Sequence, residues 1–188
     1  MDQERLPFYK SKWLIVLMLL IVVPFLLLGC SNSNYSNNPD DTEIKTISSE
    51  EDLKNIIHSV VREKTNNDNQ ERIISLSIQE DGESGDSNNK IITANLLADS
   101  SSFGNTKFKI LMNSAKISEK IFKDEQVSQF ILLWDLPLVD AYGNVDNALV
   151  ARIVLSKDTA NLINWENLNY ERLPEIADEY FEHNALSK

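Results

Sequence analysis

Several residue types that support common kinds of chemistry are scarce in this chain. Its 188 residues include one cysteine, two histidines and five glycines. A single cysteine excludes an internal disulfide and any metal site built from several thiolates. The sequence contains neither a glycine-rich phosphate-binding loop nor a G-x-S-x-G motif. It therefore lacks the best-defined signatures of nucleotide-binding proteins and serine hydrolases.

One long apolar run is present, at Trp13–Leu28. It carries no charge, and three basic residues, Arg5, Lys10 and Lys12, precede it. The run is shorter than the roughly 20 apolar residues that a membrane-spanning helix needs. A positively charged start, an apolar middle and a small residue at the exit, here Gly29, form the layout of a secretory signal peptide.

The residues that end this run, Leu27-Leu28-Gly29-Cys30, resemble the lipobox of bacterial lipoproteins. In that family the cysteine receives a diacylglyceryl group, the signal peptide is cut before it, and the new amino terminus is usually acylated. The resemblance implies a signal peptide over residues 1–29 and a lipid anchor at Cys30, on the extracytoplasmic face of the cell membrane. Each buried methylene contributes about 0.8 kcal/mol, so two or three acyl chains anchor firmly. The alternative is an ordinary membrane span that happens to end in cysteine.

The rest of the chain divides into a tether and a domain. Residues 30–43 are polar apart from Cys30 and Tyr35, and we expect them to form a flexible tether. Residues 44–188 are predicted to form a single domain. Without residues 1–29, which hold three basic and two acidic residues, 15 Lys and Arg remain against 27 Asp and Glu, a net charge of −12. Nucleic acid is not an expected partner, because its binding needs clustered cations.

Hydrophobic periodicity predicts an α+β domain with two β-hairpins. Hairpins imply antiparallel pairing, and helices must cover one face of the sheet to bury it. The expected fold is an antiparallel sheet of about four strands with helices packed on one face. The predicted helices lie near 53–61, 105–123, 156–163 and 174–181, and the predicted strands at 74–78, 91–97, 127–136 and 148–155.

A second resemblance covers about the last third of the chain. The segments WDLPLVDAYGN (134–144), INWENLNYERLP (163–174) and ADEYFEHNAL (177–186) are similar to those of small extracytoplasmic proteins of unassigned function from Gram-positive bacteria. The resemblance implies an extracytoplasmic role and no particular activity.

Two groups of residues are candidate metal ligands. His58 and His183 are far apart in the sequence, and a site would need them to meet a carboxylate in space. Four oxygen-bearing residues surround one predicted turn, but their spacing does not match a calcium loop, and Asp and Asn are common in turns for backbone reasons. We therefore predict neither a metal nor another cofactor. The four residues are Asp135, Asp140, Asn144 and Asp146.

Three aromatic residues in predicted loops are the candidate binding residues. Tyr142 lies in the turn of the second hairpin, and Trp165 and Tyr170 lie in an irregular polar segment. Tyr and Trp are enriched among the residues that dominate contact energies. If Trp165 or Tyr170 is exposed, its segment is the predicted partner site; if Trp165 is buried, it belongs to the core.

The leading functional hypothesis is a lipid-anchored extracytoplasmic binding or interaction module without catalytic activity. Its partner would be another cell-envelope protein or a surface ligand, with the membrane engaged through Cys30. One alternative is a cell-wall-directed hydrolase, because a carboxylate pair could be formed by some of the many acidic residues. The other is a small-solute receptor, although the chain is short for two lobes that close about a hinge.

Replacing Cys30 by Ala should abolish lipid labelling and leave the precursor uncut, because the sulfur that carries the diacylglyceryl group is removed. Labelling with a fatty-acid analogue, followed by electrophoresis, measures both effects. Acyl incorporation that persists in the variant would contradict the lipoprotein assignment.

Overall fold

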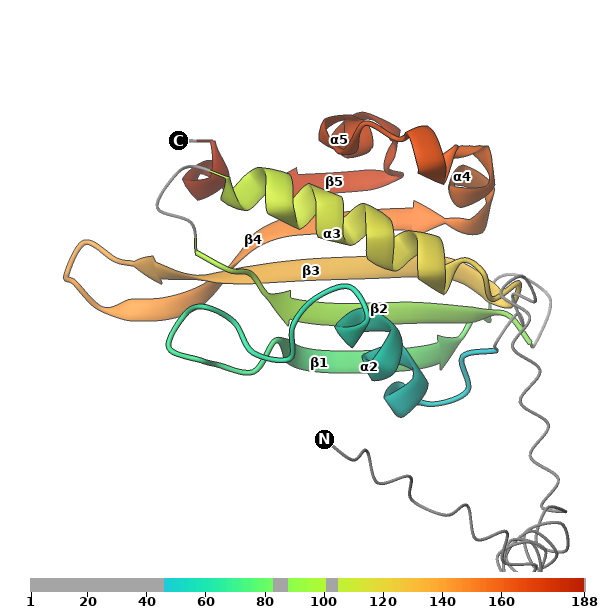
Figure 1. Cartoon of the computed structure of the whole chain (residues 1–188), viewed down its shortest axis with the longest axis horizontal. Coiled ribbons are helices and arrows are strands. Elements are labelled where there is room, and N and C mark those ends of the chain that lie inside the picture. The colour runs from blue at the N-terminus through green and yellow to red at the C-terminus, as the bar shows by residue number, and fades with distance from the viewer. Residues whose placement is uncertain (1–45, 83–87, 101–104, 188) are drawn as a thin grey trace, which may run out of the picture. The chain divides into compact units, whose positions relative to one another are not determined.

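Five strands form one mixed sheet, and the two longest helices lie on the same face of it (Figure 1). This computed structural model describes residues 46–82, 88–100 and 105–187, which belong to one compact unit. The strands cross the sheet in the order of the sequence. They are β1 (Ile73–Glu80), β2 (Lys90–Leu97), β3 (Val127–Val139), β4 (Val145–Ser156) and β5 (Glu179–Glu182). The helices are α2 (Glu50–His58), α3 (Thr106–Ile121), α4 (Lys157–Leu162) and α5 (Leu173–Ile176), with 3-10 turns at Trp165–Asn167, Tyr170–Arg172 and Asn184–Leu186.

Particular residues explain where α2 begins and how α3 packs. α2 begins after Ser49, whose hydroxyl accepts a hydrogen bond from the backbone N–H of Asp52 and so satisfies one free donor of the first turn. α3, predicted as a helix near 105–123, is buried on more than one side: Leu111 and Ile117 are both fully buried. Its Ser114 hydroxyl accepts a hydrogen bond of 2.9 Å from the indole N–H of Trp134 on β3.

The predicted α+β class and both hairpins are confirmed, but the sheet has five strands and is not antiparallel throughout. β1 pairs with β2 and β3 with β4 in antiparallel fashion, whereas β2 and β3 are parallel. The reason is the connection between the hairpins. α3 carries the chain back along the sheet to the end at which β2 began, so β3 starts there and runs in the same direction as β2.

Strand β5 corrects the prediction of a final helix over residues 174–181. The helix ends at Ile176, and the chain then pairs along the edge of β4. Asp178 makes the junction: its backbone N–H donates to the carbonyl of Val154, and its carboxylate accepts from the backbone N–H of Ser156 at 2.6 Å. The apolar spacing favoured a helix, but the unpaired edge of β4 supplies hydrogen bonds that a short exposed helix does not.

The sheet buries one face fully and carries a mixture of polar and apolar residues on the other. Along β1, Ser75 and Gln79 are exposed and Ser77 is half-buried on that second face, where Ile131 and Leu133 of β3 are also half-buried. α2 and α3 lie on the opposite face, where buried apolar residues from three strands form the core: Ile92, Ala94, Leu96, Phe130, Leu132, Trp134, Ile153 and Leu155.

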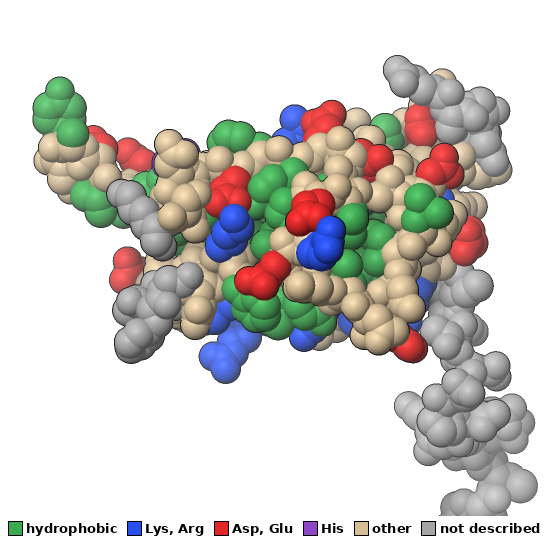
Figure 2. All heavy atoms as spheres, turned by 90° about the horizontal axis from the view of Figure 1, so that it is seen from above, with side chains coloured by type: hydrophobic (Ala, Val, Ile, Leu, Met, Phe, Trp, Pro, Cys, Tyr) green, Lys and Arg blue, Asp and Glu red, His purple; other side chains and the backbone are tan. Residues whose placement is uncertain are grey.

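The hairpin of β3 and β4 projects beyond the rest of the sheet (Figure 1). The predicted strand over residues 127–136 is too short: β3 continues through Pro137, which pairs with Asn147, to Val139. The tip is apolar and solvated, with Val139 69%, Tyr142 92% and Val145 61% exposed. Figure 2 shows hydrophobic side chains at the end of this projection.

A buried ion pair joins the start of the domain to the sheet. The ammonium of Lys90, the first residue of β2, lies 3.0 Å from a carboxylate oxygen of Asp124, whose side chain is 2% exposed. The same carboxylate oxygen accepts from the backbone N–H of Ile47 at 2.7 Å, and the Lys90 ammonium donates to the carbonyl of Ile47. Burial by itself would raise the pKa of Asp124, but hydrogen bonds from the backbone N–H groups of Ile47 and Gln126 and from Lys90 outweigh it and lower the pKa.

Replacing Asp124 by Asn should destabilise the domain by about 3 kcal/mol or more near neutral pH, because Lys90 keeps a buried charge without its partner. The folded pKa lies below the unfolded value of about 3.9, so the wild-type contribution is complete above that pH and is lost as pH falls through the folded value. Urea unfolding at neutral and at acidic pH should show the difference between wild type and variant shrinking in acid. The exposed Asp146→Asn is the control, and a difference independent of pH would contradict this role.

Candidate binding cleft

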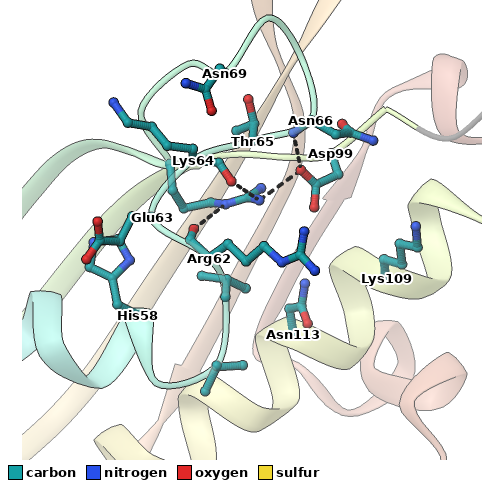
Figure 3. A pocket seen from close by; sticks show the side chains of 13 residues that line it. His58, Arg62, Glu63, Lys64, Thr65, Asn66, Asn69, Asp99, Lys109 and Asn113 are labelled. Atoms are coloured by element: carbon teal, nitrogen blue, oxygen red, sulfur yellow. Dashed lines mark hydrogen bonds and ion pairs between the residues drawn. The ribbon is translucent and has the colours of Figure 1, made fainter.

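A cleft of about 820 Å³ lies between the loop that follows α2, the end of β2 and α3 (Figure 3). A volume of this size falls in the range of small-molecule sites, roughly 300–1,000 Å³. Most of its lining residues are polar, with Val60 and Val61 as the apolar exceptions, and its only aromatic ring is the imidazole of His58. The lining residues are His58, Val60, Val61, Arg62, Glu63, Lys64, Thr65, Asn66, Asn69, Arg72, Asp99, Lys109 and Asn113.

The base of the cleft is held by Arg72, which is 2% exposed. Its guanidinium donates to the carbonyl of Leu97 at 2.5 Å and to the carbonyls of Arg62 and Lys64 at 3.2 and 3.3 Å. It also forms an ion pair of 2.8 Å with the carboxylate of Asp99. One buried side chain therefore joins two points of the loop to the end of β2, and its charge is matched.

A tight turn and an asparagine complete the support of the loop. Asp68 and Asn69 both have positive φ, at 51° and 56°, a conformation that Asp and Asn tolerate better than most residues. Asn67 attaches this turn to the chain after β2: its amide donates to the carbonyl of Ala98 at 2.6 Å, and its oxygen accepts from the backbone N–H of Ser100. The loop is thus fixed by hydrogen bonds at several positions.

Two cationic side chains at the mouth have no partner among the described residues, namely Arg62 and Lys109. Both residues are exposed. Lys109 and Asn113 are four residues apart on α3 and so share one face of the helix. In Figure 3 the side chain of Arg62 extends from the loop toward this pair, while His58 and Glu63 lie at the opposite end of the cleft.

The charges around the cleft leave an excess of positive charge at the α3 side. Arg72 and Asp99 neutralise each other, and Lys64 pairs with Glu71 outside the cleft. The remaining charged lining residues are Arg62 and Lys109 against Glu63. This local balance is opposite in sign to the net charge of −11 for the whole chain. The arrangement can hold an anionic group, with hydrogen-bond donors from two elements.

Comparison with protein-family models, with curated proteins and with solved structures finds no match for this chain. Both resemblances noted in the sequence therefore stay predictions. The lipobox and the apolar run before it lie outside the described residues. Within the part of the chain that the structure describes, no helix has the length and hydrophobicity needed to cross a membrane.

The structure separates the three predicted binding residues. Tyr142 is 92% exposed at the tip of the projecting hairpin. Trp165 and Tyr170 are half-buried and pack against the hydrophobic core, and the Tyr170 ring meets Phe108 of α3 edge-on at 6.4 Å. None of the three lines the cleft. Their role in binding stays a prediction, and the packing of Trp165 favours its alternative assignment to the core.

The candidate metal ligands either hydrogen-bond to other groups or lie far from one another. Asp140 accepts from the backbone N–H groups of Tyr142 and Asn144 at 2.8 Å each, so its carboxylate holds the hairpin turn. His183 accepts from the backbone N–H of Ala185 and begins a 3-10 turn. His58 lies in the cleft, where its Nδ1 is buried without a hydrogen-bond partner among the described residues. The described ranges contain no group of three His, Cys, Asp or Glu residues placed to bind a metal.

Sequence reasoning did not identify the cationic residues of the cleft. Arg62 and Arg72 come from the loop, and Lys109 comes from α3 beyond an intervening hairpin. The only visible signal was the spacing of Lys109 and Asn113, which is common on exposed helices. Nothing in the sequence indicates that Arg72 is buried, because its burial depends on carbonyl groups that only the folded loop places around it.

Replacing Trp165 by Ala should lower the free energy of unfolding by about 1 kcal/mol or more, because it removes a large side chain that packs against the core. Tyr142→Ala is the matched aromatic control and should leave stability nearly unchanged, since the ring is 92% exposed. Urea unfolding measures both. Equal stability of the two variants would show that Trp165 is not part of the core.

Proposed function

We propose that this protein is a lipid-anchored binding module on the extracytoplasmic face of a bacterial membrane, without catalytic activity, and that its ligand occupies the cleft. The observation that supports this proposal is the pair of unpaired cations, Arg62 and Lys109, on different walls of a cleft whose base is rigid. Eight of the other described Lys and Arg residues form ion pairs, whereas Lys116, Lys120 and Lys123 do not but lie outside the cleft lining. Two cations that line the same cleft and have no acidic partner are available to bind a ligand.

The support beneath the cleft favours binding without rearrangement. Arg72 and Asn67 fix the loop that carries Arg62, and Lys109 projects from a helix of 16 residues. A site whose groups are held in place loses less conformational entropy when it binds. Recognition therefore needs only the exposed side chains of Arg62 and Lys109 to order.

The hydrolase alternative has less support in this cleft. A glycosidase needs two carboxyl groups about 5–10 Å apart on either side of the scissile bond. Of the two acids in the lining, Asp99 already accepts from Arg72 and from the backbone N–H of Asn66. Glu63 is then the only lining carboxylate without a described partner, and a single acid cannot supply both roles.

Filling the cleft should abolish binding whatever the ligand is. Asn113→Trp places a large ring in the lining, on a half-buried position of α3. Full-length protein in detergent should capture radiolabelled cell-envelope fractions in the wild-type form and lose this capture in the variant, with an unchanged melting temperature. Asn161→Trp, at an exposed position of α4, is the control. Undiminished capture by a folded Asn113→Trp variant would remove the cleft from the function, and release of soluble sugar products would favour a hydrolase.

A further inference from the structure

The free side chains of the cleft are mainly hydrogen-bond donors. The Arg62 guanidinium has five N–H groups, the Lys109 ammonium has three, and the Asn113 amide adds two more. None of the three has a partner among the described residues. A complementary ligand must therefore be rich in acceptor oxygens and carry negative charge.

Because Phe, Tyr and Trp are absent from the lining, fewer chemical classes of ligand fit the cleft. Nucleobases, and often sugars, bind by stacking on Phe, Tyr or Trp, and the lining contains none of these. The part of the ligand that the cleft recognises is thus the charged group itself, together with polar atoms close to it. Asn69, Asn113 and Thr65 are the uncharged polar groups available for such atoms.

The number of cations and donors favours one anion over another. Arg62 lies on the loop, and Lys109 lies on α3. A carboxylate can accept from several donors at once, as Asp124 does from Ile47 and Lys90, but it has only two oxygens and one negative charge. A phosphate monoester has three terminal oxygens and a charge of about −1.5 to −2, so it matches two cations and an amide on separate walls more fully.

From these observations we infer that the cleft binds a phosphate ester, with Arg62 and Lys109 on the phosphate oxygens and Asn113 beside them. This inference rests on the proposed function of the cleft as the binding site. A volume of about 820 Å³ exceeds what one phosphate needs, so the ligand carries a further polar portion that extends toward His58 and Glu63. The ester is either a monoester of a small molecule, with three terminal oxygens, or a diester within a larger one, with two, and both present anionic oxygens to Arg62 and Lys109.

Titration calorimetry on the full-length protein in detergent tests the inference. The probes are glycerol 3-phosphate as monoester, bis-glycerol phosphate as diester, and glycerol and succinate as controls. At least one phosphate ester should bind, and Arg62→Gln and Lys109→Gln should each weaken it about tenfold or more, because each removes a charged hydrogen-bond donor. Lys116→Gln, an exposed change on the same helix, should leave the affinity unchanged.

The relative affinities of the two esters identify the source of the phosphate, and either order supports the inference. Binding of succinate as tight as that of the better ester would overturn it, as would equal binding by the Gln variants or no ester binding up to about 10 mM. Failure of this inference is distinguishable from failure of the proposed function. If Asn113→Trp abolishes envelope capture while the phosphate esters do not bind, the cleft is the site but its ligand is not a phosphate ester.

Discussion

The ion pair between Lys90 and Asp124 is the interaction on which the arrangement of this domain depends. Taking two charges out of water is expensive, and such a pair stabilises a fold only if its remaining hydrogen bonds are also satisfied. Here both partners also bind the backbone of Ile47, so the ion pair joins the first described residues, the start of β2 and the connection from α3 to β3. An apolar pair of the same size would fill the space but would leave the buried N–H and carbonyl of Ile47 without partners, and it would not fix their register.

A second buried cation acts at the other end of the same strand. Arg72 donates to the carbonyl of Leu97, the last residue of β2, and pairs with Asp99 just beyond it. β2 is thus held at both ends by a buried positive charge with a matched acid. At the Lys90 end the result is structural, because the segment that is fixed leads into α2. At the Arg72 end the segment that is fixed is an exposed loop, and a fixed exposed loop is a place where binding residues can be positioned.

Much of the fold could be predicted from local patterns, whereas the cleft could not. Hydrophobic periodicity located β1 and β2 and the long helix α3, and it placed α2 within about three residues of its actual bounds. The parallel pairing of β2 with β3 depends on the direction in which α3 returns, and β5 depends on an edge of β4 that exists only in the folded sheet. The cleft likewise combines Arg62 of the loop with Lys109 of α3, which are distant in sequence. Each of these features is set by partners distant in sequence, about which a local pattern carries no information.

A net charge of −11 disfavours an anionic ligand that is long much more than one that is short. Exposed charges more than a Debye length apart, about 8–10 Å at physiological ionic strength, are largely screened. A nucleic acid backbone spans many such lengths and meets the acidic surface repeatedly, so repulsion accumulates along it. The proposed phosphate group would meet Arg62 and Lys109 directly, whereas acidic side chains more than a Debye length away would act on it only weakly. On this proposal the acidic surface would disfavour extended polyanions much more than a single small anion.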